Sequence, residues 1–176
     1  MTKLKQIIYY IIKMYPLNLD RKNLSKLLYF SDGVFFQHHG EMLTKERYIR
    51  LENTPQMIKQ NEALMELVKE QIIIVEPDFT NLGPNLDRFY FRILSYIEIS
   101  LEREERRIIN KVLKAFKKGI DDESKQYPNL YENYLVTPIF QEIPFNKQRI
   151  NTKIQIHKKK SLLNLSGKIF RVLFET

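Results

Sequence analysis

DRKNLSKLLYFSDGVFFQHHG, residues 20–40, predicts one long helix together with both of its ends. Asp20 is a good N-cap residue, because its carboxylate can accept a hydrogen bond from a free backbone N–H of the first turn. Gly33 costs the helix some stability, and Gly40 is a natural C-terminal stop. The apolar residues that recur on one face at helical spacing are Leu24, Leu27, Leu28, Val34 and Phe35. We expect this face to pack on a shared core.

Helical and extended segments are predicted on both sides of this stretch. Residues 4–15 carry isoleucine, leucine and tyrosine at the spacing of an amphipathic helix, which Pro16 ends. Residues 47–51 (RYIRL) predict a short extended segment that ends at Asn53. Thr54 followed by Pro55 predicts the start of another helix, with the cap first and proline in the first turn, running to about Glu70.

A β-hairpin is predicted next. The β-branched run Ile72–Val75 indicates a buried strand, and residues 88–94 (RFYFRIL) alternate as its returning strand. The residues between them are rich in proline, glycine and asparagine, so they predict a long turn. Helix, helix and hairpin in this order over residues 21–94 is the arrangement of a winged helix.

The rest of the chain predicts a charged helix, a broken helical stretch and short strands. Ser100 is the expected cap of the helix, Gly119 its stop, and its buried stripe is Ile108, Ile109, Val112, Leu113 and Phe116. Residues 121–140 are interrupted by two prolines, and 153–156 and 168–173 could form strands. The fold class is therefore α+β: a mainly helical single domain with a winged-helix-like core and short C-terminal strands. We assign 1–150 to this domain and expect the basic extension 151–176 to fold onto it.

Composition excludes several classes of protein. The hydrophobic fraction of 43% is too high for a disordered chain, and the absence of cysteine excludes disulfides, thiolate metal sites and cysteine nucleophiles. The first residues contain no signal-peptide cleavage site and no apolar run long enough to span a bilayer. We expect a cytoplasmic protein with no membrane span.

The residues for catalysis are sparse. The adjacent His38 and His39 point in different directions on a helix end, and His157 is remote in sequence, so no metal site is predicted. Asp121 and Asp122 lie in a polar loop, where solvation is the simpler explanation. The five scattered glycines cannot build a phosphate-binding loop. We therefore expect no enzyme activity, no metal and no cofactor.

The net charge of +8 raises nucleic acid as a partner. The excess lies at the two ends, whereas residues 51–100 hold four basic and eight acidic residues. A helix over 55–70 would be net acidic, which opposes insertion into a DNA groove. The basic patch Lys158, Lys159 and Lys160 could contact an acidic partner, or form a solvated turn. A winged-helix transcriptional regulator remains the alternative to a protein-binding module.

The stretch 23–56 resembles the Panacea domain, the SocA-like antitoxin family, and the resemblance covers most of residues 1–150. Its KLLYFAD-type helix, later glycine and extended tyrosine-containing segment are matched here by Lys26, Leu27, Leu28, Tyr29, Phe30, Asp32, Gly40, Thr44, Tyr48 and Pro55. Residues 142–145 (EIPF) are similar to a segment near the family's end. The family's Gly-Pro turn is Thr54-Pro55 here, and the basic tail after Arg149 lies outside the resemblance.

The resemblance implies an antitoxin that neutralises a toxin or host factor by direct binding. Four aromatic residues in the 29–36 stretch cannot all point inward, so at least one is expected to line a groove or an interface. Large or polar residues on the extended segment are further contact candidates. The predicted partner-binding residues are Tyr29, Asp32, Phe36, Tyr48, Arg50 and Asn53. Packing of Tyr48 and simple solvation of Arg50 are the open alternatives.

Overall fold

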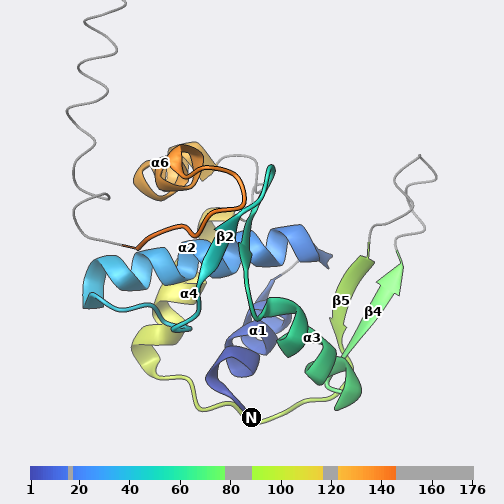
Figure 1. The fold of residues 1–176 in the computed structure, drawn as a ribbon. Coiled ribbons are helices and arrows are strands. Elements are labelled where there is room, and N and C mark those ends of the chain that lie inside the picture. Colours follow the sequence, from blue (N-terminus) through green and yellow to red (C-terminus); the bar gives the residue numbers. More distant parts are fainter. Residues whose placement is uncertain (16–17, 78–88, 117–122, 146–176) are drawn as a thin grey trace, which may run out of the picture. The chain divides into compact units, whose positions relative to one another are not determined.

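The computed structural model describes residues 1–15, 18–77, 89–116 and 123–145. The chain divides into two units, Met1–Pro144 and Phe145–Thr176. Almost all of the second unit falls outside the described residues. The predicted extension 151–176 therefore lies outside them too, with its strands, His157 and the basic patch Lys158, Lys159 and Lys160. Asp121 and Asp122 are also outside the described part. The first unit is α+β and mainly helical, as predicted (Figure 1).

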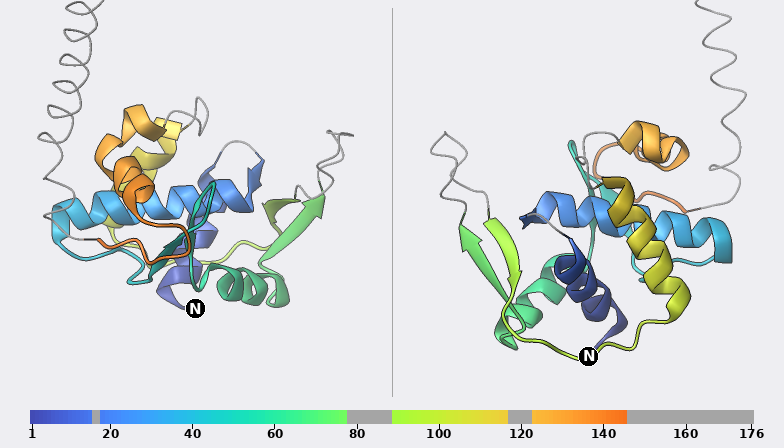
Figure 2. Two further views of the ribbon diagram at one scale, coloured as in Figure 1. Left: turned by 45° about the horizontal axis from the view of Figure 1, so that its top comes forward. Right: turned by 180° about the vertical axis from the view of Figure 1, so that it is seen from behind.

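α2 (Arg21–His39) is the central element of the first unit. As predicted, Asp20 caps it: an Asp20 carboxylate oxygen accepts from the Asn23 backbone N–H at 2.6 Å. Gly40 ends it with φ 79°, a left-handed conformation that glycine adopts without strain. The helix contacts β3 (Pro55–Met57) on one side and α4 (Arg103–Phe116) on the other. Figures 1 and 2 show α2 between these two elements.

α2 is buried on more than one face because it is covered from several sides. α1 (Lys3–Met14) packs against α2, α3 (Gln60–Lys69) and α4, and buries its isoleucines. The stripe predicted on α4 is buried as expected. α5 (Glu123–Gln126) and α6 (Pro128–Val136) form the broken helical stretch. A Cβ on Gly33 would lie 2.5 Å from a Leu130 methyl carbon, so glycine at this position allows α6 to approach α2 closely.

The sheet order is that of a winged helix. β4 (Ile73–Pro77) pairs antiparallel with β5 (Phe89–Ile93), and β5 pairs in turn with β1 (Leu19–Asp20). The strand order β1-β5-β4, together with α1, α2 and α3, completes that arrangement. The second hairpin, β2 (Tyr48–Arg50) with β3, is inserted between α2 and α3.

Two predicted boundaries and one predicted buried position were wrong. Thr54 and Pro55 do not start a helix, because Pro55 pairs with Arg50 in the β2–β3 hairpin, and the fixed φ of proline also suits an extended strand end. The helix begins at Gln60. α4 begins at Arg103 rather than after Ser100, and the Glu105 carboxylate accepts from the Glu102 N–H at 2.7 Å. The strand over Ile72–Val75 was predicted to be buried, but only its first residues are buried and Val75 is exposed.

Candidate functional site

A buried cluster of polar and aromatic side chains joins α2 to the β2–β3 hairpin. One Asp32 carboxylate oxygen accepts from the Thr44 backbone N–H at 2.7 Å. The other accepts from the Thr44 hydroxyl at 2.5 Å and the Tyr48 hydroxyl at 2.6 Å. The Tyr29 and Tyr48 rings meet edge to face with centroids 5.4 Å apart. We call Tyr29, Asp32, Thr44 and Tyr48 the motif cluster, because all four lie within the stretch that resembles the family.

Electrostatics in the motif cluster reflect its burial. Loss of solvation raises the pKa of Asp32 from 3.8 to about 6, although the hydrogen bonds from Thr44 and Tyr48 favour the charged form. Burial also raises the pKa of Tyr48 well above its ordinary value, and the nearby Asp32 adds to this. Tyr29, Asp32 and Tyr48 have no exposed surface, and Thr44 exposes only 7%. The chemistry of the cluster is therefore that of a structural support.

Reciprocal contacts tie the same hairpin to α6. The Arg50 guanidinium donates to the backbone carbonyls of Leu135 and Thr137 at the end of α6, and lies over the Tyr134 ring. In return, the Tyr134 hydroxyl donates to the carbonyls of Leu51 and Glu52, each at 2.9 Å. These contacts fix the position of the turn between β2 and β3.

The six predicted partner-binding residues therefore separate into two groups. Tyr29, Asp32 and Tyr48 are fully buried, so in this structure they cannot touch a partner; their side chains hold helices and hairpin together. This corrects the prediction for these three, and packing was the right alternative for Tyr48. Arg50 is half-buried against α6, and Phe36 is half-exposed. Asn53 alone of the six is well exposed, in the turn between β2 and β3.

A groove of about 1080 Å³ lies beside this turn. Its walls are α3, the β4–β5 hairpin, the start of α2 and the β2–β3 turn, which lie next to one another in Figure 1. The lining combines six apolar residues with seven polar or charged ones: Leu51, Leu64, Met65, Val75, Phe89, Phe91, Thr54, Gln56, Asn61, Asn23, Asp20, Arg21 and Lys22. Its volume is at the upper end of the range for ligand pockets, so it can take several side chains at once.

The groove exists because the β4–β5 hairpin extends past the core. Val75 pairs with Phe91 and Pro77 with Phe89, so these side chains share the face that also carries Ile73. Ile73 is fully buried under the helices, whereas Val75 and Phe89 expose 44% and 46% of their surface. Across the groove, Met65 of α3 is 73% exposed. An apolar surface of this kind typically marks an interaction site.

Buried polar contacts hold the walls of the groove in place. The Gln60 amide, at the start of α3, accepts from the Ser25 hydroxyl at 2.6 Å and donates to the Arg21 carbonyl at 3.3 Å. The start of α3 is thereby fixed to the first turns of α2. The groove is thus built into the fold before any partner arrives, which lowers the entropic cost of binding.

The sequence pattern missed the groove residues. Val68 of α3 is exposed, and Met65 is the most exposed apolar residue of this helix. Met65 lies one position from the buried Leu64, outside the stripe that faces the core. An apolar residue outside the buried stripe of its helix is the feature of the sequence that could have identified Met65. For Val75 and Phe89 no local signal existed, because strand patterns do not show where the helices above a sheet end.

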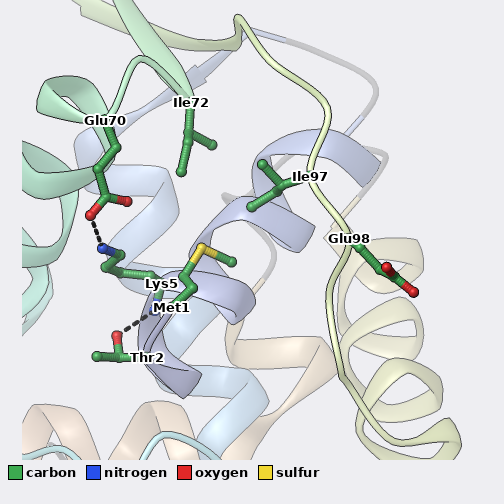
Figure 3. Close-up of a pocket in the computed structure, with 7 residues that line it drawn as sticks. All are labelled: Met1, Thr2, Lys5, Glu70, Ile72, Ile97 and Glu98. Atoms are coloured by element: carbon green, nitrogen blue, oxygen red, sulfur yellow. Dashed lines mark hydrogen bonds and ion pairs between the residues drawn. The ribbon is translucent and has the colours of Figure 1, made fainter.

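A second, smaller cavity of about 540 Å³ lies at the start of α1 (Figure 3). Its buried cation, Lys5, already donates to Glu70 at 2.5 Å and Glu66 at 3.1 Å. Loss of solvation partly offsets the effect of these carboxylates, which raise the pKa of Lys5. The contact therefore joins α1 to the end of α3. It also occupies the ammonium group of Lys5, the charged side chain that α1 contributes to the cavity.

Of the described residues, His38 and His39 line neither the groove nor the smaller cavity. His38 and His39 are exposed at the end of α2, and His39 stacks on Phe35 with ring centroids 4.2 Å apart. Within the described residues, no group of three potential metal ligands comes together. None of the described helices is both long and apolar enough to cross a membrane. A separate apolar patch surrounds Phe140, which is 78% exposed: Leu135, Val136, Ile139 and Phe140.

The family model for the SocA-like antitoxin, Panacea domain, matches residues 24–126. The chain belongs to this family. No curated protein and no solved structure matches it. The Panacea match includes the motif cluster, the β2–β3 hairpin, α3, the β4–β5 hairpin and α4. The motif cluster is thus a buried support of the domain, while the exposed groove side chains on α3, β4 and β5 also lie within the match.

Proposed function

We propose that this Panacea domain is an antitoxin that neutralises a toxin protein in the cytoplasm by binding it directly, with no enzyme activity of its own. The observation that carries the proposal is the exposed apolar groove, found in a member of the SocA-like antitoxin family. A groove that combines apolar residues with polar ones suits recognition of another molecule rather than catalysis, since its lining includes no histidine and a single carboxylate, Asp20.

Burial of the groove supplies the energy for binding. Met65, Val75 and Phe89 together offer three apolar side chains, each worth at most about 1.5–3 kcal/mol on complete burial. Fixed walls reduce the ordering cost that would otherwise offset this gain. Such a site supports a stable complex with one protein, which is how an antitoxin can block the working surface of a toxin.

A DNA-binding regulator is the second candidate, because the strand order β1-β5-β4 is that of a winged helix. In such a protein α3 would lie in the major groove of DNA. The side of α3 that lines the protein's own groove carries Asn61, Leu64 and Met65, and no cation. The rest of the helix carries Glu62, Glu66 and one exposed cation, Lys69, and Glu66 pairs with Lys5. A surface that meets phosphates should instead carry unpaired Lys or Arg, so the protein partner is the better supported candidate.

The test is neutralisation of toxins encoded beside this chain. Each candidate is expressed from a promoter and ribosome-binding site unrelated to its native ones, so that repression of transcription cannot restore growth. We expect one product to arrest growth alone, and co-expression of this protein to restore it with a one-to-one complex recovered in moderate salt. Restored growth without a complex would contradict direct binding. Binding to the native upstream DNA that survives physiological salt would favour the regulator.

A further inference from the structure

The charges around the groove have a definite arrangement. Arg21 and Lys22 are exposed at its edge, and neither forms an ion pair with a described residue. Asp20 is the sole carboxylate of the lining, and both of its oxygens are occupied: Asn23 donates to them from its backbone N–H at 2.6 Å and its side-chain amide at 3.1 Å. Asp20 keeps its negative charge, so the three charged residues of the lining carry a net charge of +1, and all three lie at the start of α2.

The rest of the lining is uncharged. Leu64, Met65, Val75, Phe89 and Phe91 supply apolar surface. Asn61, Thr54 and Gln56 add neutral hydrogen-bonding groups at the sides. An occupant that fits this arrangement has apolar side chains for the floor and carboxylates at the end that faces α2.

We propose that the groove binds a peptide segment of the toxin that combines apolar side chains with acidic residues, the carboxylates facing Arg21 and Lys22. This rests on the proposed function and names the chemistry of the partner's contact segment. Apolar contacts provide most of the affinity, and the two cations set the direction in which the segment lies. Charge pairs at the edge of an interface contribute mainly to specificity and to the rate of association.

The same arrangement disfavours nucleic acid as the occupant. A phosphate backbone would meet two cations at one edge, and its polar grooves would then face the apolar side chains of α3 and β5. Such a contact would leave apolar surface unmatched and provide few of the phosphate contacts that support DNA affinity.

The first experiment selects peptides from a displayed library of random twelve-residue sequences on the wild-type full chain. We expect the selected peptides to be enriched in both large apolar residues and Asp or Glu. Enrichment of basic peptides, or of apolar peptides without acidic residues, would overturn the proposal. Light scattering of the same sample tests a second copy as occupant: dimers that Met65→Glu dissociates would also overturn it.

The second experiment uses the selected acidic peptide and a partner peptide in which its acidic residues are replaced by lysine. Reversal of both cations, Arg21→Glu with Lys22→Glu, should weaken the acidic peptide about tenfold and strengthen the lysine peptide. The matched control is the reversal of two exposed lysines of α4, Lys111→Glu with Lys114→Glu, which should change neither affinity more than about twofold. Equal effects of the two double variants would show that only net charge matters, and would overturn the assigned direction.

Met65→Glu separates this inference from the proposed function. In the neutralisation assay we expect it to weaken toxin binding at least about tenfold, because it places a carboxylate on the apolar wall. If the wild type neutralises the toxin and Met65→Glu does so with unchanged affinity, the groove is not the site, while the antitoxin function stands. If the wild type neutralises no toxin, the proposed function fails, and the peptide selection still tests the groove.

Discussion

The two hairpins of this domain differ in how the rest of the chain surrounds them. β2–β3 is held on several sides: Tyr48 reaches Asp32 of α2, Arg50 and Tyr134 join it to α6, and the backbone of residues 140–143 bonds along β2. β4–β5 pairs with the short β1 and is covered by helices only at its base, so that its apolar face continues into the groove.

The difference separates support from recognition. The four residues of the motif cluster lie against the tightly held hairpin and are buried, so they do not face the surroundings of the domain. The less covered hairpin carries side chains whose apolar surface is still available. A motif can therefore mark the parts that must stay fixed, while the contact residues lie on neighbouring elements with less obvious sequence signals.

The largest expected effect on stability comes from removing the carboxylate of α2 that binds the segment leading into the β2–β3 hairpin. Asp32→Ala removes the acceptor for three buried donors, the Thr44 N–H and the hydroxyls of Thr44 and Tyr48. We expect the free energy of unfolding, measured with urea at pH 5, to fall by about 3–5 kcal/mol.

The adjacent Ser31 provides a matched control. Its buried hydroxyl has no hydrogen-bond partner among the described residues, so Ser31→Ala should change stability by less than about 0.5 kcal/mol. Equal losses for the two variants would mean that any change in this turn of α2 is damaging, and that the hydrogen bonds of Asp32 are not the cause.

A second prediction concerns pH. The folded state holds the Asp32 proton more tightly than the unfolded state, because burial raises its pKa from 3.8 to about 6. The associated stability is complete below the unfolded pKa and is lost as pH rises through 6. We expect the difference in unfolding free energy between wild type and Asp32→Asn to fall by as much as about 3 kcal/mol from pH 4 to pH 7. A difference that stays constant or rises would contradict this.

A smaller effect is expected where the held hairpin meets α6. Arg50→Ala removes the donor to two carbonyls at the end of α6, and should lower stability by about 1–2 kcal/mol in urea denaturation. Arg47 is the control, because its side chain is 68% exposed and pairs with Glu142 at 3.3 Å. Arg47→Ala should cost less than about 0.5 kcal/mol. A larger loss of stability for Arg47→Ala than for Arg50→Ala would mean that the contact of Arg50 with α6 does not hold the β2–β3 hairpin in place.

The smallest effect on stability is expected at the open hairpin. Val75→Thr keeps the shape of a half-exposed side chain, so we expect a change within about 0.5 kcal/mol. Ile73→Val, two residues earlier on the same strand but fully buried, should cost about 0.5–1.5 kcal/mol. If Val75→Thr proved the more costly of the two in thermal unfolding, the groove would be part of the core.

Much of the fold could be predicted because its signals are local. Asp20 and Gly40 mark both ends of α2, and the alternating residues of 88–94 mark the returning strand. Thr54-Pro55 misled because a cap residue before proline suits both a helix start and a hairpin strand. Only the pairing of Pro55 with Arg50 decides between them.

The site was less predictable because it depends on contacts distant in sequence. Tyr48 looked like a contact residue on an extended segment, but its hydroxyl reaches a carboxylate on another element. Gly33 looked like a cost to its helix, but its lack of a Cβ admits Leu130. The exposure of Val75 depends on where α3 ends relative to the sheet, which no local pattern records.

The most direct measurement is calorimetric titration of the toxin into three proteins: wild type, Met65→Glu and Val136→Glu. Both substitutions place a carboxylate on an exposed apolar helix residue, the first in the groove and the second in the patch around Phe140. The groove account predicts that Met65→Glu raises Kd at least about tenfold and that Val136→Glu changes it less than about twofold. Loss of binding in Val136→Glu with full binding in Met65→Glu would contradict it, and would place the toxin on α6.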